Sequence, residues 1–222
     1  MSPKTVTADP VHVAMPVFPI RGNRVILRDR LLEDLERVVF WETHGEHLVY
    51  DAPWENRSNT DELQQEFIKR CESELPEYRG GAIIATNDNF PIGTLNRYYK
   101  KDNEFAPYIG ISIKDDDYLN IGFGSEAFKL WLDYQFTNPS TTRVGAETWS
   151  FNPRAIRLIE KTGFKLEGVL REFREWEGKR IDALIYGILR REWQITQHQQ
   201  QHQHYKSKIQ NPKSKIVEFQ CP

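Results

Sequence analysis

Residues 118–128, which read YLNIGFGSEAF, organise the middle of this chain. Two glycines, Gly122 and Gly124, stand just before a run whose apolar positions repeat with helical spacing: Ala127, Leu130, Trp131 and Tyr134. Glycines before a helix allow backbone N–H groups to approach a phosphate closely, and the helix N-terminus favours negative charge. The stretch therefore predicts a phosphate cradle, although an ordinary loop before a helix would have the same pattern.

The same glycines also fit a dinucleotide fingerprint. Gly122-x-Gly124-x-x-Ala127 matches G-x-G-x-x-G/A, and Glu147 follows where a ribose-binding acid is expected. That motif requires a tight turn directly after a strand, whereas the polar-leaning residues 114–120 come between the glycines and the preceding apolar run. Glu147 itself falls inside an expected strand. Both observations disfavour a nicotinamide or flavin enzyme.

The flanking sequence alternates strand and helix patterns. Apolar and β-branched runs predict strands at 24–28, 81–85, 92–98, 108–113, 143–149, 166–176 and 180–189. Helical periodicity predicts helices over 31–39, from Thr60 to about 75, over 123–134 and over 153–162. Asn152-Pro153 has the chemistry of a helix start, Gly163 that of a helix end, and 86–89 that of a hairpin turn.

The chain has 222 residues, which favours one domain with appendages. Residues 1–22 contain four prolines and predict an extended lead-in, and residues 23–193 form the expected domain. Residues 194–222 are Gln/His-rich and repeat a Lys-Ser-Lys-Ile motif, which predicts a low-complexity, disordered tail. His198, His202 and His204 in this tail would bind a metal only adventitiously.

Composition excludes several classes of function. The formal charge of −2 disfavours a general binder of nucleic acid or anionic membranes. Cys71 and Cys221 are far apart and have no partner at metal-ligand spacing, which predicts no metal site and a reducing compartment. No long apolar run or export signal is present, so we expect a cytoplasmic protein.

Four motifs together resemble a known family. They are Gly122-x-Gly124-x-Glu126-Ala127, Asn152-x-x-Ala155, Glu160-Lys161-x-Gly163-Phe164 and Arg180-x-Asp182-Ala183-x-x-Tyr186. Over residues 24–193 the chain resembles the GNAT superfamily of acyl-CoA-dependent N-acyltransferases, in its RimJ/RimL-like branch. The resemblance implies an α/β (α+β) fold, with a splayed, mixed sheet of six to seven strands and helices on both faces.

The resemblance also implies an activity. An acetyl group from acetyl-CoA would pass to a primary amine, on a protein N-terminus or a small molecule, by direct attack in a ternary complex. The protein would be a monomer or homodimer with no nucleic-acid or membrane partner. The alternative is a non-catalytic acyl-CoA-binding or regulatory module on the same fold.

Cofactor-binding residues follow from the same resemblance. The family's pyrophosphate loop, Arg/Gln-x-x-Gly-x-Gly/Ala, maps onto Leu119, Asn120, Ile121, Gly122, Phe123 and Gly124. Leu119 departs from the pattern, but the loop binds mainly through main-chain N–H groups, and the Ser125 hydroxyl is a candidate compensation. The backbone of Ile111, Ser112 and Ile113 would bind the pantetheine arm, with Asn152 opposite. Arg157 or Lys161 would meet the adenosine phosphates.

Acyl transfer needs a neutral amine, a donor to the oxyanion and a proton for the thiolate. At pH 7, deprotonating an amine of pKa near 10.4 costs about 4.6 kcal/mol, against about 1 kcal/mol for an α-amine. The family's usual tyrosine and serine proton donors fall at Ile159 and Ala155, and a common glutamate falls at Tyr108. The remaining catalytic candidates are Glu147 as a base through water, Tyr108 as an acid and Ser150 as a relay. The backbone N–H near Ile111 would be the oxyanion donor.

Aromatic and acidic residues suggest an acceptor groove. The family resemblance places the aromatic candidates beside this groove: Trp41, Trp54, Tyr98, Tyr99 and Trp176. Asp51, Glu55 and Glu104 weakly indicate a cationic acceptor.

Overall fold

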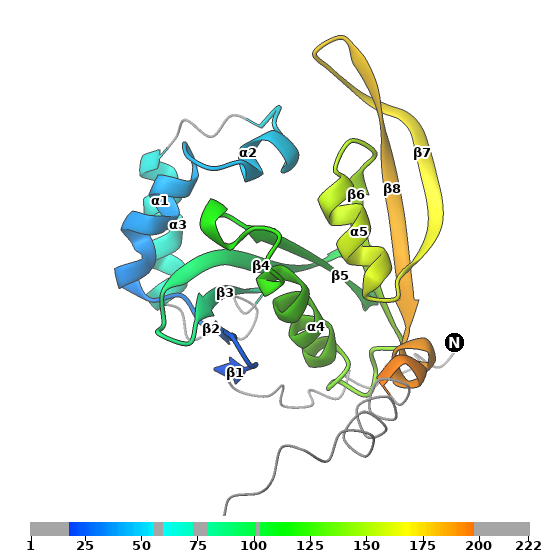
Figure 1. Cartoon of the computed structure of the whole chain (residues 1–222), viewed down its shortest axis with the longest axis horizontal. Helices are drawn as coiled ribbons and strands as arrows, with labels where there is room; N and C mark the ends of the chain where they lie inside the picture. The colour runs from blue at the N-terminus through cyan, green and yellow to red at the C-terminus, as the bar shows by residue number, and fades with distance from the viewer. Residues whose placement is uncertain (1–17, 56–59, 73–79, 101–102, 198–222) are drawn as a thin grey trace, which may run out of the picture.

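A computed structural model describes residues 18–55, 60–72, 80–100 and 103–197 (Figure 1). Its centre is a mixed sheet of eight strands in the order β1-β2-β3-β4-β5-β6-β8-β7. The strands are β1 (Ile20–Arg21), β2 (Val25–Arg28), β3 (Gly81–Thr86), β4 (Pro91–Lys100), β5 (Asn103–Ile113), β6 (Arg143–Trp149), β7 (Lys165–Trp176) and β8 (Lys179–Leu189). The β5–β6 pair is parallel, and the other neighbours are antiparallel.

Helices connect and cover these strands. They are the 3-10 turns η1 (Leu32–Asp34) and η3 (Asp116–Tyr118), with α1 (Leu35–Trp41), α2 (His47–Tyr50), α3 (Thr60–Glu72), α4 (Phe123–Gln135) and α5 (Pro153–Lys161). A further helix spans 190–197. It passes the boundary expected at 193, and β1 likewise lies within the expected lead-in and adds an eighth strand. Residues 1–17 and 198–222, which include the three tail histidines, lie outside the described residues.

The two faces of the sheet are covered by different helices. Alternate strand residues, such as Leu27 and Ile84, pack with Phe128 and Trp131 of α4 in the main core. The intervening residues of β2 and β3, including Ile83, are also buried and face the other way. On that side, η1 and α1 follow β2, and α1 packs against α3 (Figure 1).

Local signals read from the sequence are confirmed where the chain forms its turns and helix ends. The Asn152 side chain accepts a hydrogen bond from the Ala155 amide at 3.0 Å, and Pro153 is the first residue of α5. Gly163 ends this helix with a φ of 99°, in the left-handed region that glycine tolerates best. β3 and β4 form the expected hairpin.

The sheet opens between β5 and β6. These two strands share a single bridge, between Tyr108 and Gly145, whereas β5 stays paired with β4 as far as Ile113. Beyond the bridge, β5 and β6 diverge (Figure 1). This confirms the splayed sheet expected from the sequence, and it exposes the β6-facing edge of β5.

Candidate functional site

A cleft of about 460 Å³ lies where the two strands part. Its lining includes Ile111, Ser112 and Ile113 of β5, Glu147 and Trp149 of β6, and Asn152, Arg154, Ala155 and Leu158 at the start of α5. Leu119 and Gly124 contribute from the glycine loop. Residues predicted from separate parts of the sequence are therefore brought to one site.

The cleft passes through the sheet rather than lying on one face. Ile109, Ile111 and Ile113 point to the face that packs against α4, in the main core. Ser112 faces the opposite side with its partner Thr94, since directly paired residues share a face. Both sets line the cleft, so it has an apolar side under α4 and α5 and a polar side across the sheet.

The edge of β5 inside the cleft has unpaired hydrogen-bonding groups. Among the described residues, β5 pairs with β4 over positions 110–113, whereas its pairing with β6 is confined to the bridge of Tyr108 with Gly145. Alternate amides and carbonyls of this edge therefore face the opening, as at any strand edge. An extended chain with amide groups could add to this edge as a strand would.

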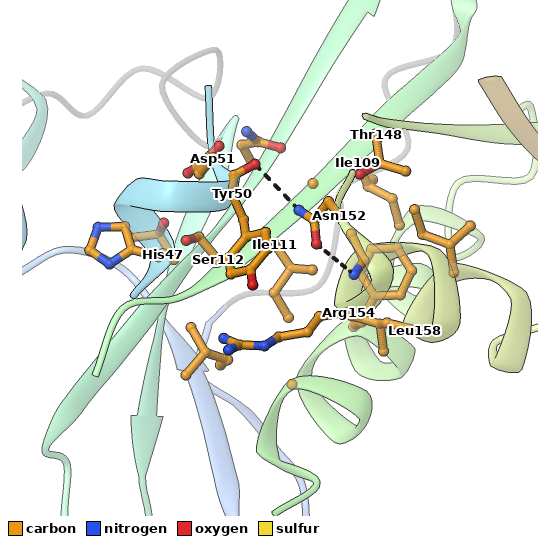
Figure 2. A pocket seen from close by; sticks show the side chains of 18 of the residues that line it. His47, Tyr50, Asp51, Ile109, Ile111, Ser112, Thr148, Asn152, Arg154 and Leu158 are labelled. Carbon is orange, nitrogen blue, oxygen red and sulfur yellow. Dashed lines mark hydrogen bonds between the residues drawn. The ribbon is translucent and has the colours of Figure 1, made fainter. Parts of the chain in front are cut away.

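Helix α2 covers the polar side of the cleft (Figure 2). It contributes His47 and Tyr50, and Asp51 follows it. The Asn152 side-chain amide donates to the Tyr50 carbonyl at 3.4 Å, and Arg154 forms an ion pair with Glu46. These contacts hold α2 to the start of α5 across the cleft. A helix of four residues is too short for a periodic sequence signal, so sequence reasoning missed it.

The glycine loop turns sharply into α4. Asn120 and Gly122 both have left-handed backbones, with φ of 60° and 96°, and Gly122 is the N-cap of the helix. Gly124 lies against β5, because a Cβ there would lie 3.3 Å from Cγ1 of Ile113. The first-turn amides of α4 thus stand at the edge of the cleft, where a helix N-terminus favours an anion.

Arg24 supports this loop and was missed by sequence reasoning. Its guanidinium donates to the Ile121 carbonyl at 2.9 Å and lies 4.9 Å from the centre of the Phe123 ring. Its amide donates to Glu126 at 2.9 Å. The pairing could not be read from the sequence, since Arg24 and Glu126 are far apart in the chain and meet only through the packing of α4 on β2.

Several predicted site residues lie outside the cleft lining. Asn120, Ile121, Gly122, Phe123 and Ser125 belong to the loop and first turn beside Gly124. Arg157 is on the exposed side of α5. Tyr108 is buried, with its ring over Gly145, and Ser150 Oγ accepts a hydrogen bond from the Asp182 amide at 3.2 Å.

Glu147 has a defined environment on the polar side. Its carboxylate forms an ion pair with Lys100 and accepts a hydrogen bond from the Tyr98 hydroxyl at 3.2 Å. Partial burial of the Tyr98 hydroxyl, then the nearby Glu147 carboxylate, raise its pKa well above the usual value. Tyr98 therefore stays protonated near neutral pH and holds one carboxylate oxygen of Glu147 in place.

The expected acceptor groove is corrected in one respect. Trp41 is wrong as a groove residue, because it is fully buried in a second core cluster with Val38 and Phe67. Tyr98 lines the cleft, whereas Tyr99 is exposed beside Arg97. The side chain of Glu104 lies outside the described residues.

A sheet that splays after a short parallel contact, with a glycine-started helix at the opening, is the arrangement that the resemblance to the GNAT N-acyltransferases implies. A sequence profile of the Acetyltransferase (GNAT) domain matches residues 24–165. The chain belongs to this family and is an acyl-CoA-dependent acetyltransferase.

Individual relatives agree. The uncharacterized N-acetyltransferase YoaA of Bacillus subtilis is 27% identical over 179 residues, 78% of this chain and 98% of that protein. The uncharacterized N-acetyltransferase p20 of Bacillus licheniformis is 35% identical over 72 residues, 32% of this chain and only 40% of that protein.

Solved structures show the same fold. The spermidine N-acetyltransferase from Vibrio cholerae in complex with CoA and spermine has a TM-score of 0.64 and 20% identity, covering 78% of this chain and 99% of that one. The ribosomal-protein-S5-alanine acetyltransferase from Vibrio fischeri has a TM-score of 0.63 and 20% identity, covering 79% and 98%.

The described ranges contain neither a helix suited to cross a membrane nor a cluster of metal-ligating side chains. No helix within them is long and apolar enough to cross a membrane. No group of three or more His, Cys, Asp or Glu side chains there is arranged to hold a metal ion.

Proposed function

We propose that the protein transfers an acetyl group from acetyl-CoA to a primary amine, by direct attack while both substrates are bound. The observation that carries this proposal is the cleft through the sheet, which offers a separate side to each substrate. We place the chain in the RimJ/RimL-like branch and in the cytoplasm, as a monomer or homodimer. Relatives of the same fold are named for a ribosomal-protein alanine and for spermidine, so both acceptor classes stay within the proposal.

The donor would enter along β5 and the glycine loop. The free edge at Ile111, Ser112 and Ile113 would bond the amides of the pantetheine arm. The pyrophosphate would meet main-chain amides of the loop over 119–125, with the Ser125 hydroxyl beside them, and Arg157 would reach the adenosine phosphates. Asn152 Oδ1 already caps α5 and its amide bonds Tyr50, so it would shape the opposite wall.

The amine would approach from the polar side. The attack needs a neutral amine, so Glu147 would accept its proton through a water molecule, with Tyr98 fixing the carboxylate. A phenol with a raised pKa is a poor proton source for a thiolate of pKa near 8.5, so Tyr98 orients rather than protonates. Tyr108 and Ser150 remain proposed proton carriers: the Tyr108 ring stacks on that of Tyr98 at 5.6 Å, and Ser150 Oγ accepts a hydrogen bond from the Asp182 amide. The main-chain amide near Ile111 would bond the oxyanion.

The test combines turnover with a charge reversal. Acetyl-CoA and a panel of amines are incubated with the protein, and released thiol is measured with a chromogenic disulfide. Asn120→Glu, next to the loop, should weaken acetyl-CoA binding by about tenfold because it opposes the pyrophosphate. Asn120→Gln introduces a side chain of the same length as Glu but without the charge, and it should leave acetyl-CoA binding unchanged. Equal affinities of the two variants would refute the loop placement, and absence of thiol release on every amine would refute the activity.

A further inference from the structure

Five aromatic side chains form a connected surface beside the polar mouth of the cleft. This aromatic patch consists of Trp54, Trp149, Phe151, Phe173 and Trp176. Ring centres lie 6.2 Å apart for Phe173 and Trp149, 4.7 Å for Trp149 and Trp54, 6.4 Å for Trp54 and Phe151, and 6.1 Å for Phe151 and Trp176. None of the five is buried, and Phe173 is 55% exposed. Such a cluster of partly exposed aromatic rings is typical of a binding surface.

The aromatic patch is continuous with the cleft. Trp149 lines the cleft and is also the central ring of the patch. Trp149 follows Glu147 by two positions on β6, so both side chains point to the same face, about 7 Å apart along the strand. An extended polypeptide advances about 3.5 Å per residue. If its amino group lies at Glu147, its second and third residues therefore reach Trp149, and the next ones reach Phe173.

A bulge in the edge strand presents Phe173. Between Leu170 and Arg174 the pairing of β7 with β8 shifts, and Glu172 has a left-handed backbone with φ of 50°. The Glu172 amide donates to Asp182 at 2.8 Å, and the Asp182 amide donates to Ser150 at 3.2 Å. Bulges beside active sites commonly redirect a side chain. This one directs Phe173 onto Trp149, and Ser150 helps to hold it.

Two carboxylates near the mouth already have cationic partners. Glu147 is paired with Lys100, and Glu46 with Arg154. The Arg174 guanidinium lies 4.5 Å from the centre of the Trp54 ring and adds a positive charge within the patch. A polyamine would have to compete with Lys100 and Arg154 for these two carboxylates, whereas a chain with apolar side chains would meet exposed rings.

We propose that the aromatic patch binds the acceptor, and that the acceptor is a polypeptide N-terminus with large apolar or aromatic side chains among its second to fourth residues. This inference rests on the proposed function and selects one of its two acceptor classes. Binding would bury the exposed face of Phe173 and place the terminal amine at Glu147.

Binding, rather than turnover, tests the inference. Two peptides with the same length, charge and N-terminal residue are compared, one with Trp and Phe at positions 2 and 3 and one with Ser and Gly. Each has a fluorescent label at its C-terminus, and anisotropy gives its Kd for the protein saturated with CoA. The apolar peptide should bind roughly tenfold more tightly, as expected for an aromatic contact at an interface centre. Equal affinities would overturn the proposal.

Variants locate the contact. Phe173→Ala should remove the preference for the apolar peptide and leave acetyl-CoA affinity unchanged, which also shows that the variant folds. The matched control is Leu166→Ala, on the same strand, similarly exposed at 51% and outside the patch. It should keep the preference. A preference that survives Phe173→Ala, or is lost equally in Leu166→Ala, contradicts the assignment.

Two further outcomes are distinguishable. If thiol release fails with every amine, the proposed function fails, while the peptide affinities still decide whether the patch is a binding surface. Sedimentation velocity of the wild type and Phe173→Ala tests whether a second copy of the chain covers the patch instead. A wild-type dimer that this substitution dissociates would make the patch a self-interface and overturn the proposal. Tighter competition by spermidine than by the apolar peptide would do the same.

Discussion

Tyr98 and Glu147 meet across an intervening strand: the Tyr98 hydroxyl on β4 lies 3.2 Å from Oε2 of Glu147 on β6. The contact is possible because Tyr98 pairs with Tyr108 and Tyr108 with Gly145, so that Glu147, two positions beyond Gly145, lies on the same face of the sheet as Tyr98. The register of three strands thus positions the hydrogen bond that orients the candidate base, beside the place where the sheet opens.

Replacing this carboxylate should slow the chemical step. We expect Glu147→Gln to lower kcat by roughly 10²-fold, the usual contribution of a positioned base, with acetyl-CoA affinity unchanged. The loss should be larger for an alkylamine than for an α-amine, because the higher pKa of the alkylamine makes its deprotonation cost more free energy. Steady-state kinetics against both amines check this. The control is Glu167→Gln, whose carboxylate pairs with Arg143 outside the cleft. Similar losses in both variants would contradict the role of Glu147.

A side chain at Gly122 should damage the cofactor loop. Gly122→Ala forces a Cβ into a left-handed backbone, at about 1 kcal/mol, and places it 2.7 Å from the Arg24 guanidinium. We expect weaker acetyl-CoA binding by calorimetry. Gly178→Ala is the matched control, since Gly178 has a φ of 72° and open space around it in the distal hairpin. It should lower stability similarly and leave cofactor affinity intact. Equal effects on affinity would show that the loop is not the binding element.

The buried ion pair of Arg28 and Asp34 should matter more for stability than the exposed ion pairs of this protein. Their atoms lie 2.7 and 2.8 Å apart, and their residues are only 7% and 2% exposed. Asp34→Asn leaves a buried guanidinium without its counter-charge, so we expect a loss of about 3–5 kcal/mol in urea unfolding. Glu66→Gln removes a pair with Arg70 whose side chains are 58% and 41% exposed, and should change stability by less than about 0.5 kcal/mol.

Glu192 should contribute to stability in a pH-dependent way. Hydrogen bonds from Lys165 and from the Leu189 amide lower the pKa of Glu192 in the folded protein. A lowered folded-state pKa gives stability that is present above the unfolded value, near 4.3, and is lost as pH falls through the folded value. Glu192→Gln should therefore be less stable than wild type at pH 7, and the difference should shrink towards pH 3.

Thermal or urea unfolding at several pH values measures that difference. Glu175→Gln is the control, because its pair with Arg180 is largely exposed on both sides. A wild-type advantage over Glu192→Gln that is constant from pH 7 to pH 3 would contradict the prediction.

Sequence reasoning predicted the features that depend on neighbouring residues. The cap at Asn152-Pro153, the helix end at Gly163 and the hairpin after residue 86 need only local turn chemistry, and the structure confirms them. The family motifs likewise predicted the splayed sheet and the acetyltransferase class, which the family profile confirms.

Features that depend on register or distant packing were not predictable. The Tyr98–Glu147 contact requires the pairing of three strands, and Arg24 reaches the loop only because α4 crosses β2. The left-handed backbone at the bulge belongs to Glu172, and without a glycine there the sequence contains no signal for it. Trp41 was misplaced because one aromatic residue on a helix does not reveal whether it faces a core or a groove.

The single bridge between Tyr108 and Gly145 has a consequence for the local stability of the sheet. Where most sheets continue their ladder, this one leaves the edge of β5 open beyond one register position. In the proposed function, the pantetheine chain of acetyl-CoA would bond to this open edge as a neighbouring strand would. Donor binding would then stabilise the centre of the sheet against local opening, and donor release would remove that stabilisation in each turnover.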